Sequence, residues 1–158
     1  MQEDYLKGKD GRYSRLYKQL YHLVKDVESP VSRMATVAAL LHYKMANFFW
    51  TGFYFLEEGE LIVGPYQGPL ACLKLQKGQG VCWAGINREE SVIVDNVHDF
   101  PGHIACSSLS NSEIVVPVKD QNGSAVAVLD VDSKLLSNFD NVDKINLEKI
   151  VSLVYNSL

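Results

Sequence analysis

The sequence predicts an α+β fold in which a single antiparallel β-sheet is flanked by N-terminal and C-terminal helices, with loops closing a ligand pocket. Three observations support this prediction. Apolar residues recur at helical spacing near both ends of the chain, and the segments between them are rich in the aromatic and β-branched residues of strands. Asn122-Gly123 joins the last two strands as a tight hairpin. Because helices and strands occupy separate stretches, the sheet is expected to be antiparallel.

Length and charge restrict the classes of protein that fit. A chain of 158 residues is expected to form one domain over residues 1–158, with N-terminal helices in 1–45 and the sheet, pocket loops and closing helix in 46–158. The net charge is −4 without a lysine or arginine cluster, so neither nucleic acid nor an anionic membrane is an expected partner. The polar start, Met1 to Tyr5, leads into no apolar run, which predicts a cytoplasmic protein without a signal peptide.

Two helices are expected first. Residues 11–27 carry apolar side chains at helical spacing, namely Leu16, Leu20, Leu23, Val24 and Val27. Ser29 and Pro30 then start a second helix, because serine is a good N-cap and proline fits the first helical position. This helix is expected to end near Met45.

The segment from Phe48 to Glu57 is the strongest strand candidate. Both of its faces are apolar: one carries Phe48, Trp50, Gly52 and Tyr54, and the other carries Phe49, Thr51, Phe53 and Phe55. A strand of this kind belongs in the middle of a covered sheet. The other expected elements are a turn at Glu58-Gly59, strands Leu61–Tyr66 and Ala71–Leu75, a short helix Val81–Ile86, a strand Ser91–Asp95, a loop 96–111, hairpin strands Ser112–Lys119 and Ser124–Asp132, and a helix capped by Asp140 that runs to about Tyr155.

The hairpin is expected to gather carboxyl side chains. If Asn122-Gly123 is a two-residue loop, Glu113 faces Asp132 and Val115 faces Asp130, so the three acids share a face near Cys106. Crowded carboxylates raise one another's pKa, and at least one carboxyl is then protonated at neutral pH. An extra turn residue would shift this alignment. The alternative, that Asp130 and Asp132 simply mark the end of a strand, stays open at this point.

The three cysteines differ in their surroundings. Cys72 and Cys82 lie among apolar neighbours and are expected in the core, whereas Cys106 lies in a polar loop close to His103. No two cysteines have the close spacing of paired zinc ligands, so no metal is expected, although Cys106 with His103 would supply half of a site. A loop cysteine in a reducing compartment is a candidate redox nucleophile.

Two further features are compatible with a ligand pocket. Trp50 and Tyr54 share a strand face and would wall a pocket, although aromatic residues on a central strand also serve simply as core. Gly78 and Gly80 precede a short helix and would present backbone N–H groups to an anion. Neither feature by itself identifies a ligand.

Five segments together resemble the free methionine-(R)-sulfoxide reductases, small enzymes built on a GAF domain. They cover nearly the whole chain from the aromatic strand to the final helix, and they are Gly64–Cys72, Gly78–Cys82, Val97–Cys106, Ser112–Pro117 and Val128–Ser133. The block Pro101-Gly-His-Ile-Ala-Cys106, with all three cysteines present, is the most specific part, because ordinary GAF sensor domains lack it. Trp83 departs from the pattern, since a smaller residue is expected after Cys82.

The resemblance implies a GAF-like fold and a role for each site residue. In the catalytic set, Cys106 is the nucleophile, Cys72 the resolving cysteine and Cys82 an auxiliary thiol. The pocket residues that it implies are the carboxyls of Glu113, Asp130 and Asp132 and the aromatic walls of Trp50 and Tyr54.

The implied reaction is the reduction of free L-methionine-(R)-sulfoxide without a cofactor. The Cys106 thiolate attacks the sulfoxide sulfur while a protonated carboxyl, Glu113 or Asp130, donates to the oxygen, which leaves methionine and a sulfenic acid. Cys72 converts this to a disulfide that a thioredoxin-like reductant reduces. Nearby carboxylates should raise the pKa of the Cys106 thiol, so substrate protonation is expected to carry more of the catalysis than thiolate abundance. The resemblance also implies a homodimer formed through the N-terminal helices.

Two other functions fit the same fold. A GAF module that only binds a small ligand would need neither Cys106 nor the acidic cluster. A thiol redox sensor would keep the disulfide but show no turnover. Consumption of free methionine sulfoxide in the presence of dithiothreitol or thioredoxin separates the three functions.

Overall fold

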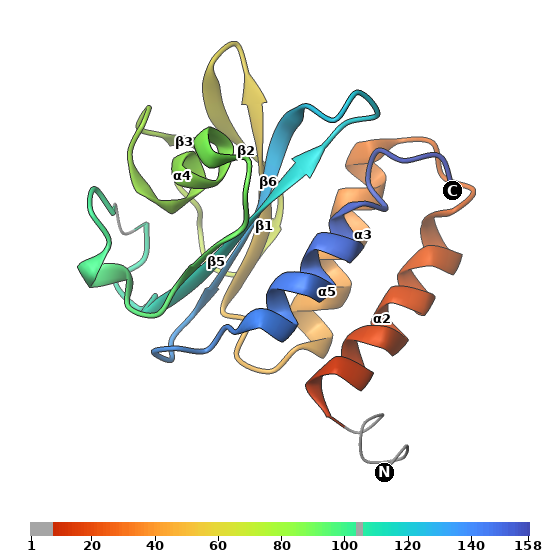
Figure 1. Cartoon of the computed structure of the whole chain (residues 1–158), viewed down its shortest axis with the longest axis horizontal. Helices are drawn as coiled ribbons and strands as arrows, with labels where there is room; N and C mark the ends of the chain where they lie inside the picture. Colours follow the sequence, from red (N-terminus) through yellow and green to blue (C-terminus); the bar gives the residue numbers. More distant parts are fainter. Residues whose placement is uncertain (1–7, 104–105) are drawn as a thin grey trace.

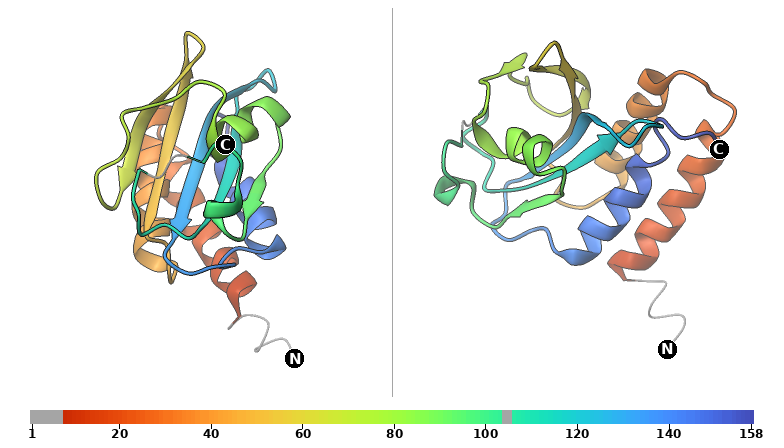
Figure 2. Two further views of the ribbon diagram at one scale, coloured as in Figure 1. Left: turned by 90° about the vertical axis from the view of Figure 1, so that its left-hand side faces the viewer. Right: turned by 45° about the horizontal axis from the view of Figure 1, so that its top comes forward.

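The computed structural model describes residues 8–103 and 106–158, and this part of the chain forms three layers (Figure 1). A six-stranded antiparallel sheet, in the order β3-β2-β1-β6-β5-β4, is the middle layer. Helices α3 (Pro30–Lys44) and α5 (Asn141–Val151) cover one face, and α2 (Lys9–Val24) packs against the outer side of both. Helix α4 (Gly80–Arg88) and neighbouring loops lie over the other face, as the second view in Figure 2 also shows. The predicted α+β architecture is confirmed.

The strands follow the order expected from the sequence. They are β1 (Trp50–Glu57), β2 (Glu60–Gln67), β3 (Lys74–Leu75), β4 (Val92–Val94), β5 (Ser112–Lys119) and β6 (Ala125–Ser133), with a 3-10 turn η1 (Val97–Asp99) between β4 and β5. None of the helices in the described ranges combines the length and the apolar character that crossing a bilayer requires.

Local sequence signals explain where two of the helices begin. The Ser29 hydroxyl accepts a hydrogen bond from the backbone N–H of Ser32, and Pro30 occupies the first position of α3, as predicted. At the start of α5, the Asp140 carboxylate accepts from the backbone N–H of Asp143, while the Asp143 carboxylate accepts from that of Asp140. This reciprocal capping box satisfies N–H groups that the first helical turn leaves without partners.

Buried polar side chains tie the helices to one another. The Tyr13 hydroxyl on α2 donates to Asp143 at 2.6 Å, and the Lys9 ammonium also contacts this fully buried carboxylate. Arg33 on α3 donates to the backbone oxygens of Leu153 and Asn156 beyond the end of α5, at 2.9 and 2.7 Å. The helical layer is thus fixed at both ends of α5.

Strand β1 lies inside the sheet between β2 and β6, as its two apolar faces predicted. Phe53 belongs to the core under the helices, whereas Trp50 and Tyr54 belong to the core under α4. Phe48 and Phe49, which precede the strand, are exceptions to the predicted alternation. Phe49 packs on the side of Trp50 and Tyr54. Phe48 packs on the helix side and lies with its ring centroid 5.7 Å from that of Phe139.

The β5–β6 hairpin has the predicted register, although its turn differs from the predicted one. Glu113 pairs with Asp132 and Val115 with Asp130. The turn contains an additional residue, because the backbone N–H of Asp120 bonds to Ser124 across three residues, with Gly123 at φ +80°. A bulge between Val118 and Lys119 compensates for this extra residue and restores the alignment.

Several expected elements are shorter than predicted: the first helix ends at Val24, before Val27, and β4 contains only Val92–Val94. Strand β3 contains only Lys74 and Leu75, so Cys72 lies in the irregular segment before it rather than in a strand. Instead of pairing in the sheet, this segment lines a cavity through Leu70, Ala71 and Cys72. Helix α5 ends at Val151, before the predicted Tyr155, and the chain continues in turns whose carbonyl groups accept from Arg33.

Candidate active site

A cavity of about 260 Å³ lies on the face of the sheet that carries α4. Its floor comes from β1, β5 and β6, and its rim comes from the segment before β3, the first turn of α4 and the loop that leads to β5. All eight site residues named from the sequence line it: Trp50, Tyr54, Cys72, Cys82, Cys106, Glu113, Asp130 and Asp132. The fold therefore gathers residues that are spread over most of the chain.

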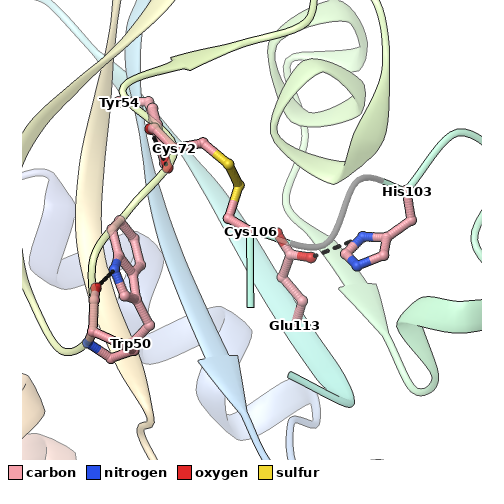
Figure 3. Close-up of a disulfide and its surroundings, with 7 residues drawn as sticks. Trp50, Tyr54, Cys72, His103, Cys106 and Glu113 are labelled. Atoms are coloured by element: carbon pink, nitrogen blue, oxygen red, sulfur yellow. Dashed lines mark hydrogen bonds and ion pairs between the residues drawn. A yellow bond between two sulfur atoms is a disulfide. The ribbon is translucent and has the colours of Figure 1, made fainter. Parts of the chain in front are cut away.

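Cys72 and Cys106 form a disulfide at the rim of this cavity (Figure 3). Their Cα atoms are 5.5 Å apart, although 34 positions separate them in the sequence. The pairing that the resemblance implied is confirmed. Cys106 is exposed and Cys82 is a buried free thiol, so the two cysteines differ in accessibility as well as in bonding.

The three carboxyl side chains lie together at the floor of the cavity, as the hairpin register predicted. Glu113 and Asp130 are only 5% and 7% exposed, and the partly buried Asp132 pairs with Glu113 across the strands. Burial, and next the charge of Asp130, raises the pKa of Glu113 and Asp132 well above the usual range. Both effects favour the neutral, protonated form of Glu113.

Asp130 is the most acidic of the three carboxyl groups. Burial raises its pKa to about 6, while hydrogen bonds from Glu113 and Cys82 favour its ionised form and limit the increase. Its Oδ1 is buried and has no hydrogen-bond partner among residues 8–103 and 106–158. Asp130 is therefore ionised, and one of its oxygens is free to accept a hydrogen bond. It lies beside Glu113, whose neutral form is favoured. Two neighbouring carboxyl groups with different pKa values can serve separately as an anion and as an acid.

Cys82 is both a core residue, as the sequence predicted, and a member of the site. It is 4% exposed, and burial followed by the charge of Asp130 raises the pKa of its thiol well above the ordinary value. Its Sγ and carboxyl oxygens of Glu113 and Asp130 lie within 4.8 Å of one another, a grouping that could hold a metal ion. The prediction that no metal binds was based on the spacing of cysteines along the sequence. That spacing cannot reveal a group of ligands that come from distant segments.

Trp50 and Tyr54 form one wall of the cavity and also anchor the segment that carries Cys72. Their rings stack with centroids 5.8 Å apart, and the indole N–H of Trp50 donates to the Pro69 carbonyl at 3.1 Å. The Tyr54 hydroxyl donates to the carbonyl of Cys72 itself at 3.2 Å. The aromatic wall thus holds the segment of Cys72, for which the resemblance implied the resolving role. Strand alternation alone could not reveal this contact.

Tyr66, which the sequence analysis did not single out, supports this wall without lining the cavity. Its ring stacks on Trp50 with centroids 5.3 Å apart. Gly52 pairs with Tyr66 across the two strands, and a Cβ there would collide with Tyr66 Cβ and approach Trp50 Cη2 to 2.6 Å, so only glycine fits. The glycine inside an aromatic strand was the available signal for this close approach.

The loop before β5 brings His103 against the acid cluster. Its Nδ1 lies 3.9 Å from Oε2 of Glu113, and Gly102 at φ +74° turns the chain just before it. Burial, and next the charge of His98, lowers the pKa of His103, so the imidazole is neutral at pH 7. Ser110, from the same loop, hydrogen bonds to Asp132, and the sequence analysis did not single it out.

Known proteins place the chain in a family. No protein-family model matches it. Over 150 residues it is 44% identical to GAF domain-containing protein A of Dictyostelium discoideum, and the match covers 94% of each chain. Over 140 residues it is 36% identical to the free methionine-R-sulfoxide reductase of Escherichia coli, covering 89% of this chain and 84% of that protein. The chain belongs to the free methionine-R-sulfoxide reductase family.

A solved structure of the free methionine-R-sulfoxide reductase family has the same fold. The X-ray structure of the Neisseria meningitidis enzyme, in complex with its substrate, superposes with a TM-score of 0.88. It is 38% identical in sequence, and the match covers 93% of this chain and 88% of that one. The fold of the chain is therefore that of a GAF domain, as the resemblance implied.

Trp83, the departure from the family pattern, is accommodated without disturbing the cavity. Its side chain is 5% exposed and packs in the apolar core under α4. The indole Nε1 is buried without a hydrogen-bond partner in the described part of the chain. Trp83 does not line the cavity, so the departure affects packing behind the free methionine-R-sulfoxide reductase site and not the site itself.

Proposed function

We propose that this protein reduces free methionine-(R)-sulfoxide to methionine, with Cys106 as the nucleophile, Glu113 as the general acid and Cys72 as the resolving thiol. The observation that carries the proposal is a disulfide between Cys72 and Cys106 in the same cavity as a buried, protonated carboxyl. A reductase of this kind needs a thiol that becomes oxidised and an acid that activates the sulfoxide oxygen. Membership of the family supports the same activity.

The first half of the reaction uses one thiolate and one proton. The Cys106 thiolate attacks the substrate sulfur, and Glu113 donates its proton to the sulfoxide oxygen. The sulfur–oxygen bond of the substrate breaks, methionine leaves, and the hydroxyl group stays on Cys106 as a sulfenic acid. The substrate sulfur gains two electrons, which Cys106 loses, and Glu113 is left as a carboxylate.

The second half restores the thiols. The Cys72 thiol attacks the sulfenic sulfur, water leaves, and the disulfide seen in the structure forms. An external dithiol then reduces it by exchange, becoming a disulfide itself. The exposed position of Cys106 favours attack by a protein reductant of the thioredoxin class. We propose that the protein works in a reducing compartment such as the cytosol, where such reductants are maintained.

Charge in the cavity supports selection of the free amino acid. Asp130 and Asp132 offer acceptors for an ammonium group, and the unpartnered Oδ1 of Asp130 is available for one. At the other side of the cavity, the first turn of α4 at Gly80 and Val81 presents backbone N–H groups suited to a carboxylate. A methionine sulfoxide inside a peptide has neither terminal charge and is too bulky for a cavity of about 260 Å³.

The charges in the cavity determine how much the Cys106 thiolate and the Glu113 acid each contribute to catalysis. Carboxylates near Cys106 oppose formation of its thiolate, so the site does not rely on an abundant nucleophile. Glu113, in contrast, has a pKa raised by burial and by Asp130, which favours the protonated form that a general acid needs. Protonation of the sulfoxide oxygen makes the sulfur more electrophilic, which compensates for a scarce thiolate.

The test is a turnover assay on matched substrates. The reduced protein, with dithiothreitol as recycling reductant, should convert free L-methionine-(R)-sulfoxide to methionine and leave the (S)-epimer unchanged. N-acetyl-methionine-(R)-sulfoxide, which lacks the ammonium group, should react far more slowly. Oxidation of the thiols without repeated methionine formation would instead identify a redox sensor, and equal rates on the free and acetylated substrates would contradict the assigned pocket charges.

A further inference from the structure

His103 is singled out by the sequence but has no part in the reaction described so far. Its imidazole lines the cavity and is 12% exposed, with Nδ1 directed at Oε2 of Glu113 at 3.9 Å (Figure 3). Its Nε2 is buried and has no hydrogen-bond partner within residues 8–103 and 106–158. The backbone N–H of His103 donates to the Phe100 carbonyl at 3.1 Å, which fixes the start of the loop.

The proposed reaction leaves Glu113 without its proton after every turnover. The resulting carboxylate is 5% exposed and adjoins Asp130, so it is poorly placed to take a proton directly from bulk water. Asp130 is hydrogen bonded to Glu113 but is the more acidic group, so it cannot hold the proton in reserve. A carrier between Glu113 and the loop side of the cavity is therefore needed.

We propose that His103 returns the proton to Glu113, from Nδ1 to Oε2, before each new turnover. The inference rests on the proposed function, because it supplies the proton that the sulfoxide oxygen consumes. The neutral imidazole takes up a proton at Nε2 from water and gives its Nδ1 proton to the Glu113 carboxylate, so that Glu113 becomes the neutral acid and the ring is neutral again. No electrons move in this step. His103 touches no reacting atom and acts through Glu113, so it is a positioning residue.

The surroundings of the imidazole suit this task. Which nitrogen of a neutral histidine carries the proton is set by its hydrogen-bond partners. Because Nε2 has no such partner in the described part of the chain, neither tautomer is imposed and the ring can exchange one for the other. The titratable groups that face His103 are Glu113 on β5 and His98 on η1. His98 is exposed to solvent. In the proposed route a proton therefore enters from water on the side of η1 and reaches Glu113 through His103.

The decisive experiment separates the first turnover from later ones. The reduced protein starts with Glu113 protonated, so a His103→Asn variant should form its first methionine at the parent rate in rapid-quench measurements. Asparagine keeps an amide nitrogen near the Nδ1 position but carries no exchangeable charge at neutral pH. The steady-state kcat with dithiothreitol should then fall by about 10²-fold, the lower end of what proton transfer contributes. Alkylation during the slow phase should find the thiols free, because disulfide reduction precedes the blocked step.

Rescue with a small base gives a readout that a structural role would not produce. In a His103→Ala variant, added imidazole should restore most of the lost steady-state rate, whereas pyrazole, a ring of similar size but much lower basicity, should not. The matched control is His22→Asn, which removes an exposed imidazole from α2 and should leave both phases unchanged. If His103→Asn loses its circular dichroism signal, His103→Ala supports the same burst comparison.

Two outcomes overturn the relay and leave the proposed function intact. First-turnover and steady-state rates that fall equally, without rescue by imidazole, assign His103 to holding the loop. An unchanged steady-state rate shows that Glu113 recovers its proton by another route. Failure of the parent protein itself to form methionine overturns the proposed function, and the relay with it. A burst with a slow, imidazole-sensitive second phase supports the relay.

Discussion

The two faces of the sheet share the same strands but serve different purposes. On the helix side, β5 and β6 present Ile114, Val116, Leu129 and Val131, all at most 1% exposed. One residue along, on the opposite face, the same strands present Glu113, Asp130 and Asp132 to the cavity. The period of two along a strand therefore separates an apolar core from a cluster of acids by a single position.

The comparison shows where stability and chemistry reside. The apolar face removes large side chains from water, which is the main source of folding free energy. The acidic face opposes folding, because three carboxyl groups are held close together with their pKa values raised. Substitutions at neighbouring positions should consequently affect different measurements, and four predictions test this separation.

The largest effect is expected at the cavity rim. Cys106→Ser should reduce methionine formation to background even with dithiothreitol, because a hydroxyl cannot replace the thiolate that accepts the oxygen. The fold should persist, since Cys106 is exposed. Cys82→Ser is the matched control, because serine still donates a hydrogen bond to Asp130, and it should keep most of the activity. Normal turnover by Cys106→Ser would remove Cys106 from the mechanism.

The next effect concerns the cavity floor. Glu113→Gln and Asp130→Asn should each lower kcat by a factor of about 10²–10⁴, the usual contribution of general acid–base catalysis. Glu113→Gln removes the proton donor, while Asp130→Asn removes the anion that raises its pKa. Glu57→Gln, at the exposed end of β1, changes the same functional group outside the cavity and should have no effect. Near-normal kcat in both site variants would contradict the assignment of the acid.

Sequence reasoning captured the features of each face that depend on local pattern. Alternation placed the three acids together, and Asp140 was correctly predicted as the N-cap of α5. The hairpin register was right although the turn was not, because an extra turn residue and a bulge cancel. The turn was wrong because an Asn-Gly pair fits loops of more than one length.

Other features depend on contacts between distant segments, which the sequence pattern does not encode. Cys72 was expected in a strand, but the Tyr54 hydroxyl holds its carbonyl in an irregular segment. Cys82 on α4 lies close to Glu113 and Asp130 on the hairpin strands. The spacing of these residues along the sequence does not predict this contact. The Cys72–Cys106 pairing came from family resemblance and not from physical reasoning about the chain.

The third prediction tests the helix-side face beside the same acids. Leu129→Ala, at a fully buried position next to Asp130, should lower the free energy of unfolding by about 2–5 kcal/mol through lost burial and a residual cavity. Urea unfolding measures this change. The kcat per folded molecule should stay near the parent value, because Leu129 points away from the cavity. A large loss of kcat in a folded Leu129→Ala protein would show that the two faces are not independent.

The smallest expected effect is a pH-dependent gain in stability of the Glu113→Gln variant. In the folded protein the pKa of Glu113 is raised, so between the ordinary glutamate pKa and this raised value the native state binds a proton that the unfolded chain has released. Stability therefore falls as pH rises through this window. Glutamine is neutral in both states and still donates to Asp130, so Glu113→Gln should avoid this loss.

Thermal unfolding of the disulfide forms at pH 4 and pH 8 measures the gain. The variant and the parent should melt at similar temperatures at pH 4, where glutamate is largely protonated even in the unfolded chain. At pH 8 the variant should melt higher, and each kcal/mol gained appears as about 2–4 °C in Tm for a domain of this size. A variant that melts lower at pH 8 would mean that Glu113 is ionised and stabilising in the fold. Glu113 could then not be the proton donor, and the cavity face would contribute to stability as the helix face does.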